Sequence, residues 1–303
     1  MTAKLSAGIL NVDKPYGMTS MEVVRRTKRA SGIKRVGHGG TLDPVATGVI
    51  PVCIGPATRM MEYLIEGTKE YRSVIELGVT TDTYDSMGEV TAAADCTDVS
   101  REQIETALES FHGEIPQVPP MFSALKKEGK RLYDLARKGI EIEREPRKVT
   151  VYDIELTEFE SPFATVEVHC GRGFYMRSLA HDLGQMLGCG GHMKTLMRLR
   201  VGPFLLRDAI AVESLDDMFA DGTWTDSVHA PDVVLGAMRA VVVGNEISKL
   251  VFDGRSIPPS VRIPASVPEE RCRVYTTDGQ FIAIVRIDSE DGQWKPEKVF
   301  HPS

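Results

Sequence analysis

The chain has 303 residues, 42% of them hydrophobic and 7% aromatic, which favours a packed globular protein and excludes an intrinsically disordered one. No apolar run approaches the roughly 20 residues of a membrane helix, and residues 1–7 lack the layout of a signal peptide. The net charge of −7 argues against a simple polyanion-binding protein, but residues 1–80 and 126–148 are locally basic. Charge alone fits a nucleic-acid surface and ordinary solvated helices equally well.

The five cysteines are odd in number, scattered and never in C-x-x-C spacing. We therefore expect reduced thiols in a cytoplasmic protein rather than a zinc site. The seven histidines also lack metal-ligand spacing, since His181 and His192 are too far apart for one helix face. The sequence predicts neither a metal nor a cofactor.

Short strands and helices alternate through the first 80 residues. The capping-box sequence T-S-M-E at residues 19–22 opens a helix that extends to about Gly32. One face of this helix is strongly basic, because it carries Arg25, Arg26, Lys28 and Arg29. A short helix is predicted from Pro56, and strands at residues 9–12, 49–54 and 70–79.

The middle of the chain contains one segment that differs from its surroundings. Residues 116–148 begin with three prolines and become basic, which we interpret as a partly mobile insertion with a short helix to Gly139. Ser100 is predicted to cap a helix that ends near Gly113. Further strands are predicted at about residues 149–159, 163–170 and 195–201, a helix ending at Gly188, and a polar linker at residues 221–231.

The C-terminal part of the chain reads as a separate small β unit. Asp278-Gly279 lies between two apolar runs at residues 273–277 and 281–287, a strong hairpin signal. We predict two domains, residues 1–235 and residues 236–303.

The segment V-G-H-G-G-T-L-D-P-V-A-T at residues 36–47 is the best candidate for a site of chemistry. Pro44 pushes Asp43 out of the α region, and the glycines allow unusual backbone conformations and close approach of a ligand. Asp43 is thus a candidate nucleophile or base. The alternative is an aspartate that only stabilises its own turn, and the loop alone slightly favours this alternative.

Several familiar motifs are absent around this loop. Leu42 replaces the last glycine of a dinucleotide-binding loop, and no Gly-Lys-Ser/Thr follows as in a phosphate-binding loop. The chain also lacks the G-x-S-x-G elbow of serine hydrolases. A glycosidase would need a second placed acid, which the sequence alone does not locate.

A series of ordered motifs resembles the bacterial tRNA pseudouridine synthase B family. The strings are N-V-D-K-P-Y-G-M-T-S at residues 11–20, G-H-G-G-T-L-D-P-V-A-T-G at 37–48, K-E-Y at 69–71, T-D-T-Y-D at 81–85, P-P-M-F-S-A-L at 119–125, G-R-G-F-Y-M-R at 171–177 and L-M-R-L at 196–199. The resemblance covers nearly the whole chain. It implies an α/β fold of the α+β type, with a mixed, largely antiparallel sheet and a small C-terminal domain of PUA type.

The resemblance also implies site residues and a reaction. Asp43 would be the nucleophile that converts uridine 55 in the T arm of tRNA to pseudouridine, attacking at C1′ or abstracting a proton at C2′. Tyr71 would stack on the flipped uracil, although a lone tyrosine on a strand is usually a packing residue. Arg177 would pair with Asp43 and lower its pKa, and Asp85 would join the same charge network.

Binding residues follow from the same resemblance. Tyr175 and Leu196 would line the base pocket, with core packing nearly as good an interpretation, and His38 would enter the T loop. Lys14 and Pro15 would support the catalytic loop. A basic thumb at about residues 120–148 would close over the RNA through Lys126, Lys127, Lys130 and Arg131. The implied partner is tRNA, bound by a monomer with no membrane attachment.

Two rival interpretations stay open. A non-catalytic RNA-binding or RNA-folding module would use the same basic patches, but it would not need Asp43, Tyr71 and Arg177 together. A pseudouridine synthase that acts on another RNA would share the whole set of motifs.

Overall fold

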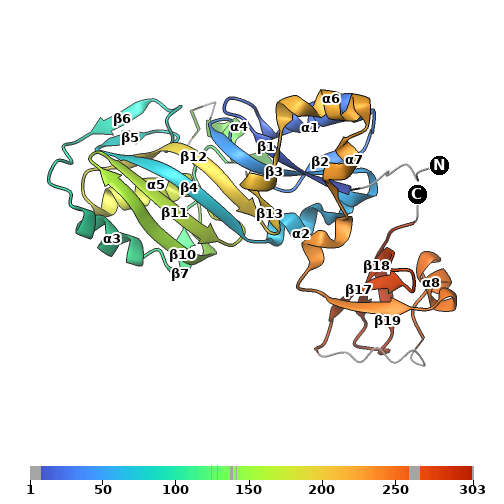
Figure 1. Ribbon diagram of the computed structural model, residues 1–303. Helices are drawn as coiled ribbons and strands as arrows, with labels where there is room; N and C mark the ends of the chain where they lie inside the picture. The colour runs from blue at the N-terminus through green and yellow to red at the C-terminus, as the bar shows by residue number, and fades with distance from the viewer. Residues whose placement is uncertain are drawn as a thin grey trace.

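The computed structural model describes residues 8–123, 125–127, 129–136, 139–140, 142–258 and 267–301. Its main element is an 11-stranded sheet with the order β14-β1-β3-β12-β4-β11-β10-β7, on which β13, β15 and β2 form additional pairings (Figure 1). The β1–β14 and β3–β12 pairings are parallel, whereas the neighbours around β4, β10 and β11 are antiparallel. The predicted mixed, largely antiparallel α+β fold is confirmed.

The strands of the large sheet come from distant parts of the chain. They are β1 (Gly8–Lys14), β2 (Val36–His38), β3 (Ala46–Ile54), β4 (Lys69–Leu77), β7 (Gly113–Gln117), β10 (Arg147–Glu160), β11 (Phe163–Cys170), β12 (Gly191–Val201), β13 (Phe204–Leu205), β14 (Ile210–Ala211) and β15 (Val228–His229). A separate two-stranded sheet pairs β5 (Val79–Thr81) with β6 (Val90–Ala93).

Helices and short 3₁₀ turns flank these strands. They are α1 (Ser20–Ser31), η1 (Gly55–Met60), α2 (Met61–Glu66), α3 (Arg101–Glu109), α5 (Met176–Met186), η2 (Leu206–Asp208), η3 (Val212–Ser214), α6 (Leu215–Asp221), α7 (Trp224–Ser227) and η4 (Pro231–Leu235). The predicted caps are present: Thr19 and Glu22 form the capping box of α1, and Gly32 ends it in a left-handed conformation. Ser100 caps α3, which ends before Gly113 because that glycine already begins β7.

Strand β3 is buried on both faces, which explains its nearly continuous apolar sequence. Val49 and Cys53 belong to a cluster with Leu64 of α2, whereas Ile50 and Val52 belong to a cluster with Val23 of α1. The alternation of successive side chains across the strand thus anchors helices on both sides of the sheet. The turn that contains Asp43 leads directly into β3, so one end of this turn is anchored by a fully packed strand.

Two segments expected to be irregular contain strand. The predicted linker at residues 221–231 is wrong in part, because it contains α7 and β15, and β15 pairs with β1. Val228 packs against the main chain of Gly8, where a Cβ atom would lie 2.2 Å from its Cγ2. The start of the glycine-rich loop is also a strand, β2, which pairs with β3. The β15–β1 pairing joins segments more than 200 residues apart, which local turn chemistry does not reveal, whereas β2 and β3 pair across only 14–18 residues.

The C-terminal strands form their own four-stranded sheet, which Figure 1 shows below α2. Its elements are β16 (Arg239–Val243), α8 (Asn245–Phe252), β17 (Arg271–Thr276), β18 (Phe281–Ile287) and β19 (Trp294–Val299). The predicted hairpin is present, with Gly279 at a φ of 83° between β17 and β18. A small C-terminal β domain is thus confirmed, while the boundary between residues 235 and 236 stays a prediction.

The basic insertion is described in part. Its main chain forms β8 (Lys126–Lys127), β9 (Lys130–Arg131) and α4 (Leu132–Ala136). The predicted RNA-binding side chains of Lys126, Lys127, Lys130 and Arg131 lie outside the described part of the structure.

Candidate functional site

Asp43 lies in a tight turn between β2 and β3. The amide of Ala46 donates to the carbonyl of Asp43 at 3.0 Å, which closes a four-residue turn with Pro44 at its second position. The amide of Gly17 donates to the carbonyl of Pro44 at 2.8 Å and ties this turn to the loop after β1. The Asp43 side chain keeps 35% of its exposure, so the carboxylate remains accessible to a ligand.

Arg177 joins two carboxylates that are 42 residues apart in the chain. Its Nη2 lies 3.0 Å from Oδ2 of Asp43, and its Nη1 lies 3.7 Å from Oδ2 of Asp85. The same guanidinium donates to the carbonyl of Phe122 at 2.9 Å, so its orientation is fixed from several sides. Asp85 is held in turn by the hydroxyl of Thr83 at 2.7 Å. The predicted network of Asp43, Arg177 and Asp85 is assembled in the structure.

Burial raises the pKa of the Asp43 carboxyl above its usual value. Arg177 opposes this effect, as an adjacent cation must, while Asp85 adds to it as a like charge. Arg177 therefore lowers the pKa of Asp43 less than burial raises it. The expected electrostatic role of Arg177 has the right sign but does not by itself set the pKa of Asp43.

Tyr71 and Leu196 lie on adjacent strands beside Asp43. Tyr71 is on β4 and packs on the cluster that contains Leu196 of β12 together with Leu42 and Val45, which flank Asp43. Burial raises the pKa of the Tyr71 hydroxyl, and the charge of Asp43 acts in the same direction. The structure thus brings Tyr71 and Leu196 into one apolar wall that continues into the Asp43 turn.

Tyr175 and His38 lie on the elements next to the Asp43–Arg177 pair, Tyr175 at the start of α5 and His38 at the end of β2. Tyr175 precedes α5, where its amide donates to Oε1 of Gln117 at 2.8 Å and Nε2 of Gln117 donates back to its carbonyl at 3.0 Å. This pair fixes the start of the helix that carries Arg177. His38 is half-buried at the end of β2, and burial lowers the pKa of its imidazole. Contact of His38 with RNA stays a prediction.

Lys14 supports the Asp43 turn through hydrogen bonds to main-chain carbonyls, as expected. Its side chain is fully buried, and Nζ donates to the carbonyls of Met18 at 2.7 Å, Pro15 at 2.9 Å and Pro44 at 3.4 Å. Burial lowers its pKa to about 8. Ser20 adds a second attachment, because its Oγ accepts from the amide of Leu42 at 2.8 Å and donates to the carbonyl of Leu42 at 2.9 Å.

Arg198 belongs to the L-M-R-L motif at residues 196–199, but the sequence indicated no role for it. It is only 1% exposed, and its Nε donates to the carbonyl of Val49 at 2.7 Å, while Nη2 donates to the carbonyl of Gly40 at 3.1 Å. It lies directly opposite Tyr71 in the β12–β4 pairing, and its charge opposes the effect of burial on the pKa of the Tyr71 hydroxyl. One signal was available, since Arg198 follows Leu196 by two residues and must share its face of the strand.

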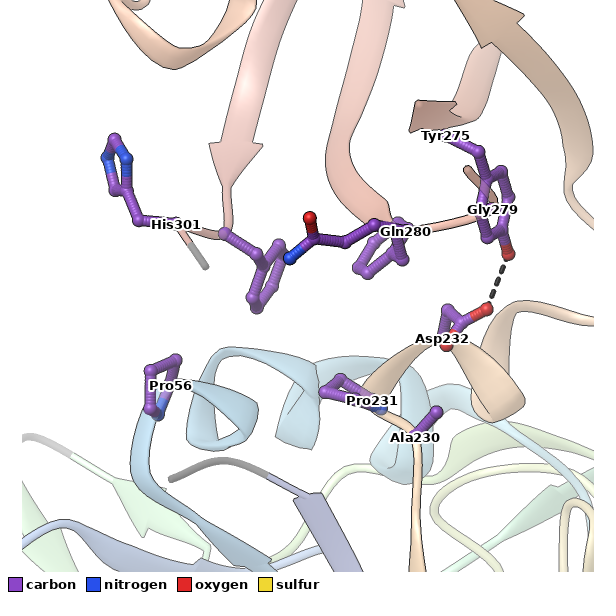
Figure 2. Close-up of a pocket in the computed structure, with 10 residues that line it drawn as sticks. Pro56, Ala230, Pro231, Asp232, Tyr275, Gly279, Gln280 and His301 are labelled. Atoms are coloured by element: carbon purple, nitrogen blue, oxygen red, sulfur yellow. Dashed lines mark hydrogen bonds between the residues drawn. The ribbon is translucent and has the colours of Figure 1, made fainter. Parts of the chain in front are cut away.

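A hollow lies where the C-terminal domain meets η1 and η4, and Asp43 is not among the residues that line it. It encloses about 350 Å³ and is lined by Pro56 and Pro231 on one side and by residues of the C-terminal domain on the other (Figure 2). Figure 2 shows the hydroxyl of Tyr275 pointing to Asp232, to which it donates at 2.5 Å. This hydrogen bond joins the domains directly.

Within the described ranges, no group of three or more histidine, cysteine or acidic side chains has a geometry that could hold a metal ion. Among the helices in the same ranges, none is long and apolar enough to cross a membrane.

A carboxylate in the turn before β3, held by an arginine of α5 beside a partly buried tyrosine of β4, agrees with the family that sequence comparison identifies. Residues 28–176 match the model of the TruB family pseudouridylate synthase N-terminal domain. Residues 177–246 match the model of the tRNA pseudouridylate synthase B C-terminal domain. The chain belongs to the TruB family of pseudouridylate synthases, which makes it an isomerase.

Curated relatives match along nearly their whole length. The chain is 48% identical over 295 residues to the tRNA pseudouridine synthase B of Pseudomonas aeruginosa, with 97% of this chain and 95% of the relative covered. It is 43% identical over 293 residues to the protein of the same name from Dehalococcoides mccartyi, with 97% and 96% covered.

Solved structures agree with this assignment. The fold is similar to a chain in the crystal structure of a Cbf5-Nop10-Gar1 complex, with a TM-score of 0.77 and 28% identity over 98% of this chain and 86% of that one. It is also similar to a chain in an H/ACA RNP bound to a substrate RNA containing 2′-deoxyuridine, with a TM-score of 0.74 and 26% identity over 97% and 85% of the two chains.

Proposed function

We propose that this protein converts uridine 55 in the T arm of tRNA to pseudouridine, with Asp43 as the nucleophile. The observation that carries the proposal is the accessible Asp43 carboxylate, 3.0 Å from Arg177 and beside the wall formed by Tyr71 and Leu196. The names of the curated relatives support tRNA as the substrate.

The reaction needs what these residues can supply. The N1–C1′ bond of the target uridine breaks and a C5–C1′ bond forms, while C5 loses a proton and N1 gains one, so atoms and electrons balance without an oxidant. Asp43 reacts at the sugar, Arg177 compensates its charge, and Tyr71 and Leu196 hold the detached base while it turns. A base inside a folded arm must first leave its stack, which costs a few kcal/mol.

The remaining roles extend this proposal to the whole chain. His38, Tyr175 and the basic insertion at residues 120–148 contact the RNA around the flipped nucleotide, and the C-terminal β domain is a PUA-like RNA-binding unit. We infer a monomer that acts in the cytoplasm, and the five free cysteines support a reducing compartment.

Tritium release from tRNA transcripts made with 5-tritiated uridine tests the catalytic assignment. We expect release by the wild type and at least a 10³-fold slower release by Asp43→Asn, since the amide is a poor nucleophile. Asp208→Asn, which changes an exposed aspartate with a 60% exposed side chain, is the matched control and should keep the wild-type rate. Equal release by the wild type and Asp43→Asn would show the assignment to be wrong.

The rival binding-module function is separated by measuring tRNA affinity in the same variants. Asp43→Asn should bind tRNA within about threefold of the wild type, because a nucleophile contributes little to ground-state binding. A wild type that binds tRNA but releases no tritium would support the rival. Mapping modified uridines in a strain that lacks this protein would identify any other RNA target.

A further inference from the structure

Arg198 occupies the strand that separates the two halves of the site. In the sheet, β12 lies between β3 and β4. Arg198 is directly opposite Gly48 of β3 on one side and Tyr71 of β4 on the other. It therefore sits between the strand that follows the Asp43 turn and the strand that carries Tyr71.

The acceptors recorded for the Arg198 guanidinium are neutral. They are the carbonyls of Val49, Gly40 and Thr41, at 2.7, 3.1 and 3.5 Å. No ion pair between Arg198 and a carboxylate is present in the described part of the chain. A cation buried without an opposite charge is costly, and an apolar side chain of similar volume is often the more stable choice. Structural stability alone is therefore a poor explanation for an arginine at this position.

Arg198 also acts on the Tyr71 hydroxyl through its charge. The guanidinium favours the anionic form of that hydroxyl and partly offsets the effect of burial on its pKa.

We propose that Arg198 is a positioning residue that holds the Asp43 turn in a fixed relation to Tyr71. It does so by donating to the carbonyls of Gly40 and Thr41 from the position directly opposite Tyr71. The inference rests on the proposed function, since it assigns Arg198 a part in the same reaction.

The test is the single-turnover rate of tritium release by Arg198→Met and Arg198→Lys, measured with tRNA affinity. We expect Arg198→Met to be about 10- to 100-fold slower, the usual effect of losing a hydrogen bond from a charged donor. tRNA affinity should change by less than about threefold, because Arg198 is buried below the site. Arg198→Lys keeps the charge but cannot reach all three carbonyl acceptors, so it should recover part of the rate.

A double-mutant cycle with Tyr71→Phe shows whether the effect passes through the tyrosine. If it does, Arg198→Met should slow Tyr71→Phe by at least about fivefold less than it slows the wild type. Equal factors in the two backgrounds would overturn the proposal, as would a change below about threefold in the wild-type background. If Arg198→Met does not fold, Arg198→Lys enters the cycle in its place.

Arg200→Met is the control for the loss of an arginine from β12. Arg200 is partly exposed, pairs with Glu70 at 2.9 Å and lies two residues further along the strand. It should keep a rate within about twofold of the wild type, and an equal loss in Arg200→Met and Arg198→Met would overturn the proposal. Failure of the proposed function is separate, because it would appear as no tritium release by the wild type.

Discussion

At the scale of single residues, burial, one cation and one anion together shift the pKa of Asp43, and this pKa limits the pH range in which Asp43 can act. Burial and Asp85 raise the pKa of its carboxyl, and Arg177 lowers it. A nucleophile must be ionised, so activity is expected to fall as the pH drops through a pKa that lies above the usual value for aspartate.

Asp85→Asn tests this electrostatic balance. The substitution removes the like charge but keeps an oxygen that can accept from Thr83 and from the amide of Met87. The pKa of Asp43 should therefore decrease, and the acid limb of the pH–rate profile of the remaining activity should move to lower pH. A limb that stays in place or moves to higher pH would contradict the role assigned to Asp85.

The same sign applies to stability. Because folding raises the pKa of Asp43, the folded state favours the protonated carboxyl. The contribution of this group to stability is therefore present at pH below the unfolded pKa and is lost as the pH rises through the folded pKa. At neutral pH the ionised Asp43 opposes folding, a common cost of a buried reactive group.

At the scale of elements, glycines near the site have two distinct reasons to be glycine. Gly48 has a φ of 100°, and a Cβ atom there would lie 2.3 Å from the carbonyl oxygen of Arg198. Gly17 has a φ of 81°, but a Cβ atom there would meet nothing within 4 Å. Gly48 is therefore required for both conformation and space, and Gly17 for conformation alone.

Replacement of each glycine by alanine separates these causes. Gly17→Ala should lower the free energy of unfolding by about 1–2 kcal/mol, the cost of a left-handed alanine. Gly48→Ala should lower it by at least about 3 kcal/mol, because the β3–β12 pairing must open as well. Urea denaturation measures both values. Similar losses in the two variants would show that the contact with Arg198 is not limiting.

Local signals in the sequence predict local structure well. The caps of α1 and α3 and the hairpin at Asp278-Gly279 are all present, because each depends on residues that are close in the chain. The pairing of β15 with β1 was missed, since it depends on apolar contacts more than 200 residues apart.

Some residues of the site could be predicted from local motifs, whereas others depend on contacts between distant parts of the chain. Asp43, Tyr71, Arg177 and Asp85 came from motifs, and the structure brings the two acids and the arginine together. The position of Arg198 between β3 and β4 was not predictable, because strand order is a property of the whole sheet. Its burial could be inferred from the alternation along β12, but its acceptors could not.

At the scale of the whole molecule, an apolar contact joins the C-terminal domain to the catalytic domain. Phe300 belongs to the same buried cluster as Met60 and Leu64, and the Arg59 guanidinium lies 5.3 Å from the centre of its ring. Arg59 also donates to the carbonyl of Val299 at 2.5 Å. The end of β19 therefore docks on η1 and α2.

Phe300→Ala is expected to loosen this docking. Loss of a buried phenylalanine typically costs about 3–5 kcal/mol, and here the loss falls on the interface between domains. Scanning calorimetry should then resolve two unfolding transitions where the two domains unfold independently. Phe163→Ala, at a phenylalanine of β11 that is 39% exposed, is the control and should leave the transition unchanged. A profile for Phe300→Ala identical to that of the control would exclude Phe300 as an anchor.

The place of β12 in the sheet has a consequence for how the protein is made. Residues 191–201 separate β3 and β4, which are complete by residue 77. During synthesis, the first half of the chain leaves the ribosome without β12, the strand that lies between β3 and β4. The partner of Asp43 and Tyr71 in the sheet is therefore translated more than 100 residues after them. Arg177, on α5, arrives with that same late segment. We therefore expect the nascent chain to be inactive on RNA until residues 191–201 have been made and inserted, about two-thirds of the way along the chain.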